Sequence, residues 1–210
     1  MWLAWAAALL VGVAGGGAVA VLARGHGTAS PPPAPPLHDV ATWAAGVRPA
    51  PSFRLVDQQG TPFSLGDLRG RPVIVTFIDP LCRNLCPLEA RVLDAAVRRL
   101  PPERRPSIVA VSVDPWGDDA ATFADDRVHW QLPAEWRWGV GTRAQLAAVW
   151  HDYAIGVQTT KTTLAGVTVR NVSHTEASYV VDASGHERAL LLYPFRVSDV
   201  LATLRRIGAA

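Results

Sequence analysis

Asp79-Pro-Leu-Cys-Arg-Asn-Leu-Cys-Pro87 is the stretch that decides the fold of this chain, because it joins an apolar run to a helical pattern. It carries Cys82 and Cys86, the only two cysteines among 210 residues. The preceding run, Pro72–Ile78, is almost continuously apolar, as is typical of a strand covered on both faces. The following residues, Leu88–Leu100, have the spacing of a helix with one apolar side. The sequence therefore predicts two thiols where a buried strand turns into a helix.

The next segments extend this pattern into a fold class. Ser107–Val113 predicts a second buried strand, and strand, helix and strand in this order form a βαβ unit with parallel strands. Ala177–Asp182 and Glu187–Tyr193 predict an antiparallel hairpin, and Arg196–Ile207 predicts a closing amphipathic helix. We therefore expect an α/β domain of thioredoxin-like architecture, with a central mixed sheet flanked by helices. Such sheets place their chemistry at the carboxyl ends of the strands.

Between these landmarks the pattern is less regular. Ser52–Val56 and Trp136–Gly139 predict short strands, Asp118–Asp126 a helix, and Thr142–Tyr153 a helix that Thr142 can cap. Residues 157–172 are β-branched and polar without a helical period, so we expect a long loop or an irregular hairpin.

The N-terminal part differs from the rest of the chain. Residues 1–23 contain no ionisable side chain and are long enough, at about 1.5 Å per residue, to cross a hydrocarbon core of about 30 Å. A cleaved signal peptide is one interpretation, since Ala18-Val-Ala20 fits a cleavage site. The length of the run and the absence of a preceding Lys or Arg favour an uncleaved transmembrane anchor. Residues 24–50 then form a Pro-rich linker, and residues 51–210 a domain outside the cytoplasm, at the periplasmic or extracytoplasmic face of a bacterial membrane.

Composition excludes other classes of function. The net charge is only +2, and no basic cluster interleaved with aromatic residues is present, so nucleic acid is not expected as a partner. Two cysteines cannot form a disulfide framework. They can form one disulfide bridge or one functional site, or alternate between the two.

Spacing restricts what the two thiols can do. On a helical turn, residues four apart lie on one face, and a helix N-terminus favours thiolate. Cys82 and Cys86 can therefore form a redox-active pair or jointly coordinate a soft ion such as Cu(I), zinc or an iron–sulfur cluster. A purely structural bridge is disfavoured, because closing so short a loop removes little entropy from the unfolded chain.

Two ligands are too few for a closed metal site, so a third is required. His174 is a candidate on position, because it precedes the Ala177–Asp182 strand, and in a thioredoxin-like fold this loop faces the thiols. We expect the other five histidines to be structural or solvated: His26, His38, His129, His151 and His186.

At this point the residues resemble the Sco/SenC family of copper chaperones for cytochrome oxidase assembly. The similarity covers about residues 51–208, and an N-terminal anchor also fits the family. Its specific part is Cys82-x-x-x-Cys86-Pro with a late His-Thr. The matching segments are Phe53–Gly60, Leu65–Val73, Cys82–Pro87, Val111–Pro115, Leu146–Trp150, Ser173–Thr175 and Tyr179–Gly185.

The resemblance implies a mononuclear copper site formed by Cys82, Cys86 and His174. Two thiolates and an imidazole suit trigonal Cu(I) and can also hold Cu(II). The implied function is a membrane-tethered metallochaperone, without catalytic turnover, that assists copper insertion into a cytochrome c oxidase subunit or passes copper to another carrier.

The family also includes thiol reductases, so a second interpretation stays open: a thiol–disulfide oxidoreductase that uses Cys82 and Cys86 to reduce cysteines of a copper-receiving partner. A peroxiredoxin-like peroxidase is a third. It is disfavoured because Asp79 stands three residues before Cys82, where a peroxidatic cysteine requires threonine, and Thr76 lies six residues before it.

Overall fold

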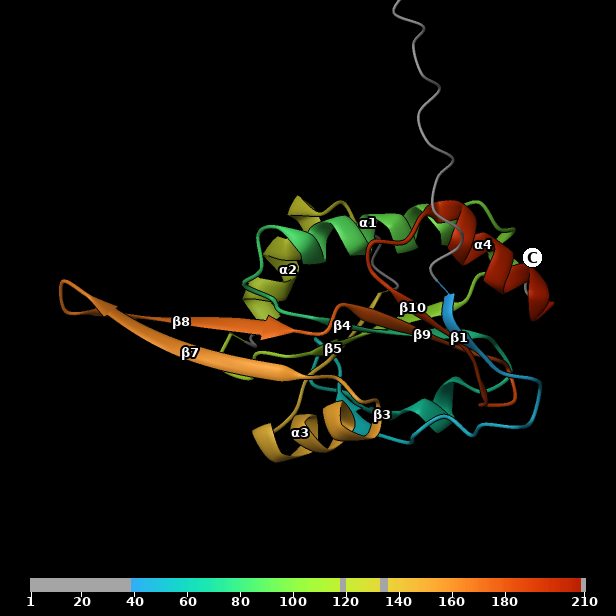
Figure 1. Ribbon diagram of the computed structural model, residues 1–210, viewed down its shortest axis with the longest axis horizontal. Helices are drawn as coiled ribbons and strands as arrows, with labels where there is room; N and C mark the ends of the chain where they lie inside the picture. The colour runs from blue at the N-terminus through green and yellow to red at the C-terminus, as the bar shows by residue number, and fades with distance from the viewer. Residues whose placement is uncertain (1–38, 118–119, 133–135, 209–210) are drawn as a thin grey trace, which may run out of the picture. The chain divides into compact units, whose positions relative to one another are not determined.

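A six-stranded mixed sheet forms the centre of the domain in the computed structural model, which describes residues 39–117, 120–132 and 136–208 (Figure 1). The strand order is β1-β10-β9-β4-β5-β6. β4, β5 and β6 pair in parallel, whereas β9 pairs antiparallel with β4 and β10, and β1 antiparallel with β10. The strands are β1 (Asp39–Thr42), β4 (Val73–Ile78), β5 (Ser107–Ser112), β6 (Arg137–Gly139), β9 (Ala177–Val181) and β10 (Glu187–Leu192).

Four α-helices and two hairpins complete the described residues. α1 and α4 lie on one side of the central sheet and α3 on the other (Figure 1). The helices are α1 (Leu85–Val97), α2 (Ala120–His129), α3 (Arg143–Asp152) and α4 (Val197–Arg206), with 3-10 turns at Leu65–Leu68 and Pro102–Arg104. The hairpins are β2 (Arg54–Val56) with β3 (Pro62–Ser64), and β7 (Val157–Leu164) with β8 (Val167–His174).

β4 is apolar throughout because it is covered on both faces. All six of its residues are buried. Ile74 and Ile78 belong to the core beneath α1 and α4, whereas Val75 and Phe77 belong to the core on the α3 side. Since successive side chains of a strand point to opposite faces, a continuous apolar run satisfies both cores at once.

α1 begins three residues before the predicted start at Leu88. The side chain of Asn84 accepts a hydrogen bond from the Leu85 amide at 2.7 Å, and the helix starts there. Cys86 and Pro87 therefore lie in the first turn. Proline is tolerated in this position because the first turn has no intrahelical partner for its missing N–H.

Residues 157–172 belong to a regular hairpin. The sequence predicts a long loop or an irregular hairpin, and the structure corrects this because the two strands pair without a register shift. β7 and β8 pair along eight residues each, and their turn has Ala165 and Gly166 at φ 50° and 80°. Two central residues with positive φ match the twist that a two-residue hairpin needs. Only the base of this hairpin, at Val157 and Val172, packs on the core and most of its other residues are exposed, so its sequence lacks the apolar alternation that predicts strands. β8 ends at His174, which lies next to the central sheet, just before β9.

The sheet also begins earlier than the sequence indicated. β1 lies within residues 24–50, the segment predicted as a linker, and pairs with β10. Within the described ranges, no helix is both long and apolar enough to span a membrane. The predicted anchor, residues 1–23, lies outside these ranges.

The α1 core gives a stability prediction. Leu93 lies on the buried face of α1, has no exposed surface and packs in the core between this helix and the sheet. Leu93→Ala should lower the free energy of unfolding by about 2–5 kcal/mol, because the surroundings collapse only partly around the cavity. Val128 is 70% exposed, so Val128→Ala should change it by less than about 0.5 kcal/mol. Urea unfolding of the full chain measures both, and equal effects would contradict the described core.

Candidate functional site

The loop between β4 and α1 holds the two cysteines in place through a tight turn. Oδ1 of Asp79 accepts a hydrogen bond from the Leu81 amide at 2.8 Å, and the Asp79 carbonyl accepts one from the Cys82 amide at 3.1 Å. This turn places Cys82 at the carboxyl end of β4, with Cys86 one helical turn later. The arrangement is the one that the strand-to-helix pattern predicted.

Cys82 is the more accessible of the two free thiols. Its sulfur accepts a hydrogen bond from the Cys86 amide at 3.4 Å. The Cys86 thiol, which donates to Cys82, is the main reason that the pKa of Cys82 falls to about 5. Burial opposes this shift, and backbone amides at the start of α1 add to it. Cys82 is therefore a thiolate at neutral pH.

Cys86 is the complementary partner. It has no exposed surface, and its pKa is raised because its proton is shared with Cys82 and because burial disfavours the charged form. The nearby Glu176 acts in the same direction. The pair therefore rests as one thiolate and one thiol, with the proton on Cys86.

His174 reaches this pair from 88 positions further along the chain. Its Nε2 lies 3.6 Å from the Cys86 sulfur, and its Nδ1 lies 3.1 Å from the Thr175 carbonyl. Since only a protonated Nδ1 can bond a carbonyl, a neutral ring keeps its lone pair on Nε2, facing the thiol. Burial lowers the pKa of His174, which favours this neutral ring.

Glu176 is a fourth polar group at the site, and the sequence motif did not point to it. Its Oε1 lies 3.4 Å from His174 Nε2 and 3.9 Å from the Cys86 sulfur. Burial, followed by the contact with Glu89, raises the pKa of Glu176 to about 9. One signal was available: residues two apart in an extended segment face the same side, so a carboxylate two residues after His174 shares its direction.

Glu89 supports the site from below. It has no exposed surface, and its Oε1 accepts hydrogen bonds from Thr76 and Ser178, each at 2.7 Å. Burial raises its pKa. These bonds tie α1 to β4 and β9 directly beneath the thiols.

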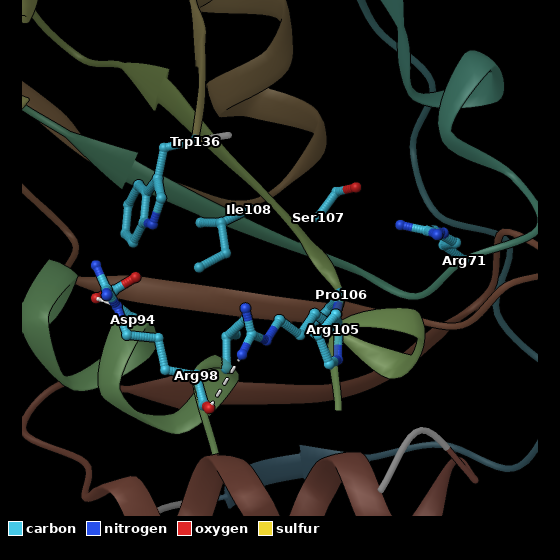
Figure 2. A pocket seen from close by; sticks show the side chains of 10 residues that line it. Arg71, Asp94, Arg98, Arg105, Pro106, Ser107, Ile108 and Trp136 are labelled. Atoms are coloured by element: carbon cyan, nitrogen blue, oxygen red, sulfur yellow. Dashed lines mark hydrogen bonds and ion pairs between the residues drawn. The ribbon is translucent and has the colours of Figure 1, made fainter. Parts of the chain in front are cut away.

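Cys82 opens onto a groove of about 320 Å³, whereas the buried donors lie behind it. The groove is bounded by the loop after β4, the end of β5 and strand β8, and its lining includes Asp79, Cys82, Asp114 and Arg170. A separate cavity of about 290 Å³ contains Arg71, Arg98 and Arg105 but no thiol or histidine (Figure 2). Of the donor atoms that can hold a soft metal, the Cys82 sulfur therefore lines the groove, and none lies in that cavity.

The remaining described histidines lie elsewhere in the structure. His129 and His151 are exposed on α2 and α3. His186 sits in the turn between β9 and β10, with Nδ1 3.0 Å from the Ser184 hydroxyl. His26 and His38 fall outside the described residues.

Comparison with known proteins identifies the family. A sequence profile of SCO1/SenC matches residues 45–208, well over half of the chain. The chain belongs to the SCO1/SenC family. No curated protein sequence matches it.

Solved structures share the fold of this family member. Copper-bound ScoI of Bradyrhizobium japonicum is 21% identical, with a TM-score of 0.65 over 75% of this chain and 98% of that chain. Copper-bound ScoI of Arabidopsis thaliana is 18% identical, with a TM-score of 0.67 over 77% and 99%. The thioredoxin domain of a thiol-disulfide oxidoreductase from Bacteroides vulgatus is 18% identical, with a TM-score of 0.55 over 80% and 97%. The predicted thioredoxin-like α/β fold is confirmed.

The shared proton of the thiol pair can be tested by alkylation. Cys82 should react with iodoacetamide with a pH midpoint near 5, and Cys86→Ala should move this midpoint upward because the donating thiol is lost. Trypsin cleaves after Arg83, so separate peptides report Cys82 and Cys86 by mass spectrometry. An unchanged midpoint in Cys86→Ala would contradict the proposed origin of the low pKa.

Proposed function

We propose that this protein is a copper-binding metallochaperone whose ligands are Cys82, Cys86 and His174. The observation that carries the proposal is the 3.6 Å approach of His174 Nε2 to the Cys86 sulfur, between residues 88 positions apart. The hydrogen bond from Nδ1 to the Thr175 carbonyl leaves Nε2 as the free donor atom. Two thiol sulfurs and an imidazole nitrogen form a set that suits Cu(I).

The surroundings of these donor atoms also suit a metal ion that is passed on to a partner protein. Cys86 is buried, whereas Cys82 lines an open groove through which a partner's ligands can approach. A site with one open side can exchange ligands one at a time, whereas a closed structural site cannot. This access supports delivery of the metal rather than permanent storage.

The proposal extends to place and partner. Residues 1–23 serve as a transmembrane anchor, residues 24–50 include a Pro-rich tether, and the domain lies at the extracytoplasmic face of a bacterial membrane. The receiver is a cytochrome c oxidase subunit or another copper carrier. The uncharged N-terminal run and the membership in the SCO1/SenC family support this part of the proposal.

One observation favours a second function, a thiol–disulfide oxidoreductase acting on a copper-receiving partner. The pKa of about 5 makes Cys82 a thiolate that can attack a partner disulfide and release the partner's first thiolate. Cys86 would then attack the Cys82 sulfur, releasing the second thiolate and leaving a Cys82–Cys86 disulfide. The oxidoreductase does not require the 3.6 Å approach of His174 Nε2 to the Cys86 sulfur, whereas the metallochaperone uses it, so the metallochaperone is the stronger candidate.

Metal binding by ligand variants tests the proposed function. The reduced full chain should bind one Cu(I) in competition with a chromophoric chelator. Cys82→Ala, Cys86→Ala and His174→Ala should each weaken binding by about 10-fold or more. His151 is exposed on α3, so His151→Ala is the matched control and should bind as the parent does.

The same variants distinguish the two functions. Parent-like Cu(I) affinity in His174→Ala, together with disulfide reductase activity that requires both cysteines, would replace the metallochaperone by the oxidoreductase. Loss of Cu(I) binding in all three variants supports the metallochaperone.

The anchor is tested by fractionation of bacterial cells that express the full chain or a variant without residues 2–23. The full chain should sediment with membranes and resist extraction by salt, because about 20 apolar residues suffice to span the bilayer. The shortened chain should be absent from the membrane fraction. A full chain found in the soluble fraction, shortened at its N-terminus, would indicate a cleaved signal peptide instead.

A further inference from the structure

The tightest group of donor atoms in the described structure includes one residue that the family resemblance does not name. Cys86 Sγ, His174 Nε2 and a Glu176 carboxylate oxygen all lie within 4.8 Å of one another, and this is the sole such group among the described residues. Cys82 is outside this group and faces the groove. Glu176 therefore lies beside the two buried donors, Cys86 and His174, although the sequence motif does not include it.

The surroundings of Glu176 leave its carboxyl oxygens available to a cation. The Glu176 side chain is 16% exposed and contacts the fully buried Glu89. Oε2 of Glu176 and Oε2 of Glu89 are both buried without a hydrogen-bond partner, and a buried polar atom without a partner is unfavourable. Within the described ranges, His174 is the single basic side chain at ion-pair distance from Glu176, and no basic side chain pairs with Glu89. The fold thus supplies buried carboxyl oxygens without a matching arginine or lysine.

The position of Glu176 also has a structural origin. Its backbone carbonyl accepts a hydrogen bond from the Tyr193 amide at 3.0 Å, at the end of β10. Thr175, beside it, donates its amide to the Gly156 carbonyl at 3.0 Å. These two bonds hold the short segment between β8 and β9, so Glu176 faces the thiols as part of a fixed backbone.

We propose that Glu176 is a fourth ligand of the copper site and that it favours Cu(II) over Cu(I). This inference rests on the proposed function. A carboxylate is a hard oxygen ligand and suits the divalent ion, whose preferred tetragonal geometry takes four ligands. Cu(I) is already satisfied by two thiolates and an imidazole. Glu176 therefore adds affinity in one oxidation state only.

The test compares Glu176→Gln with the parent in both oxidation states. Under anaerobic conditions, Cu(II) binding to the full chain should weaken by about 10-fold or more, with altered electron paramagnetic resonance g and hyperfine values. Cu(I) affinity should change by less than about threefold, since the soft ligands remain. The reduction potential should then rise by about 59 mV for each tenfold change in the ratio of the two affinities.

Two further variants make the result decisive. Glu176→Ala is measured alongside, with thermal unfolding of each, so that the outcome does not depend on the folding of one variant. Glu103→Gln is the matched control: Glu103 is exposed in the 3-10 turn Pro102–Arg104 and supplies no member of the donor group, so this variant should keep the parent's Cu(II) spectrum.

The outcomes separate the two proposals. An unchanged Cu(II) spectrum and affinity in both Glu176 variants, or an equal loss in Glu103→Gln, would overturn the fourth ligand while Cu(I) binding stands. A parent that binds Cu(I) but holds no stable Cu(II) would overturn it as well. A parent that binds neither ion would instead overturn the proposed function.

Discussion

The register of β9 against β4 is the constraint on which the site depends. Thr76 pairs with Ser178 across these antiparallel strands, and both hydroxyls donate to the same buried oxygen of Glu89 on α1. A slip of one residue would turn every side chain of β9 to the other face. It would also remove the hydrogen bond from Ser178 to the buried Glu89 carboxyl, and a buried polar atom left without its partner is costly. His174 and Glu176 precede β9 directly, so this clamp also decides where they meet Cys86.

The sequence predicted those strands whose burial requires a recognisable run of apolar residues. β4 and β5 were identifiable because both of their faces are covered, and a short uninterrupted apolar run is typical of such a strand. The β7–β8 hairpin was not, because its strands are held by backbone pairing and a positive-φ turn, neither of which requires apolar residues. The start of α1 was misplaced because Pro87 resembles a boundary, whereas the Asn84 side chain sets the actual one.

The residues of the site also fall into those that the sequence predicted and one that it did not. The thiols stood out because no other cysteine exists in the chain, and position together with a family resemblance led to His174, which the structure places beside Cys86. The sequence offered no comparable reason to select Glu176. Carboxylates are common on surfaces, and nothing local in the sequence marks this one as buried. Its burial arises from α1 and from Glu89, nearly ninety positions away. Non-local packing of this kind is what a single sequence does not display.

The site is also asymmetric, and the asymmetry bears on how a metal would enter and leave. Cys86 has no exposed surface and the His174 side chain is 3% exposed, whereas Cys82 lines the groove. A partner's ligand can therefore reach the donors first from the side of Cys82. Strand β8 forms one wall of that groove, with Arg170 stacked on the Trp116 ring at 4.0 Å. Under the proposed function, Cys82 is then the ligand that a partner can reach directly, whereas Cys86 and His174 hold the ion from the buried side.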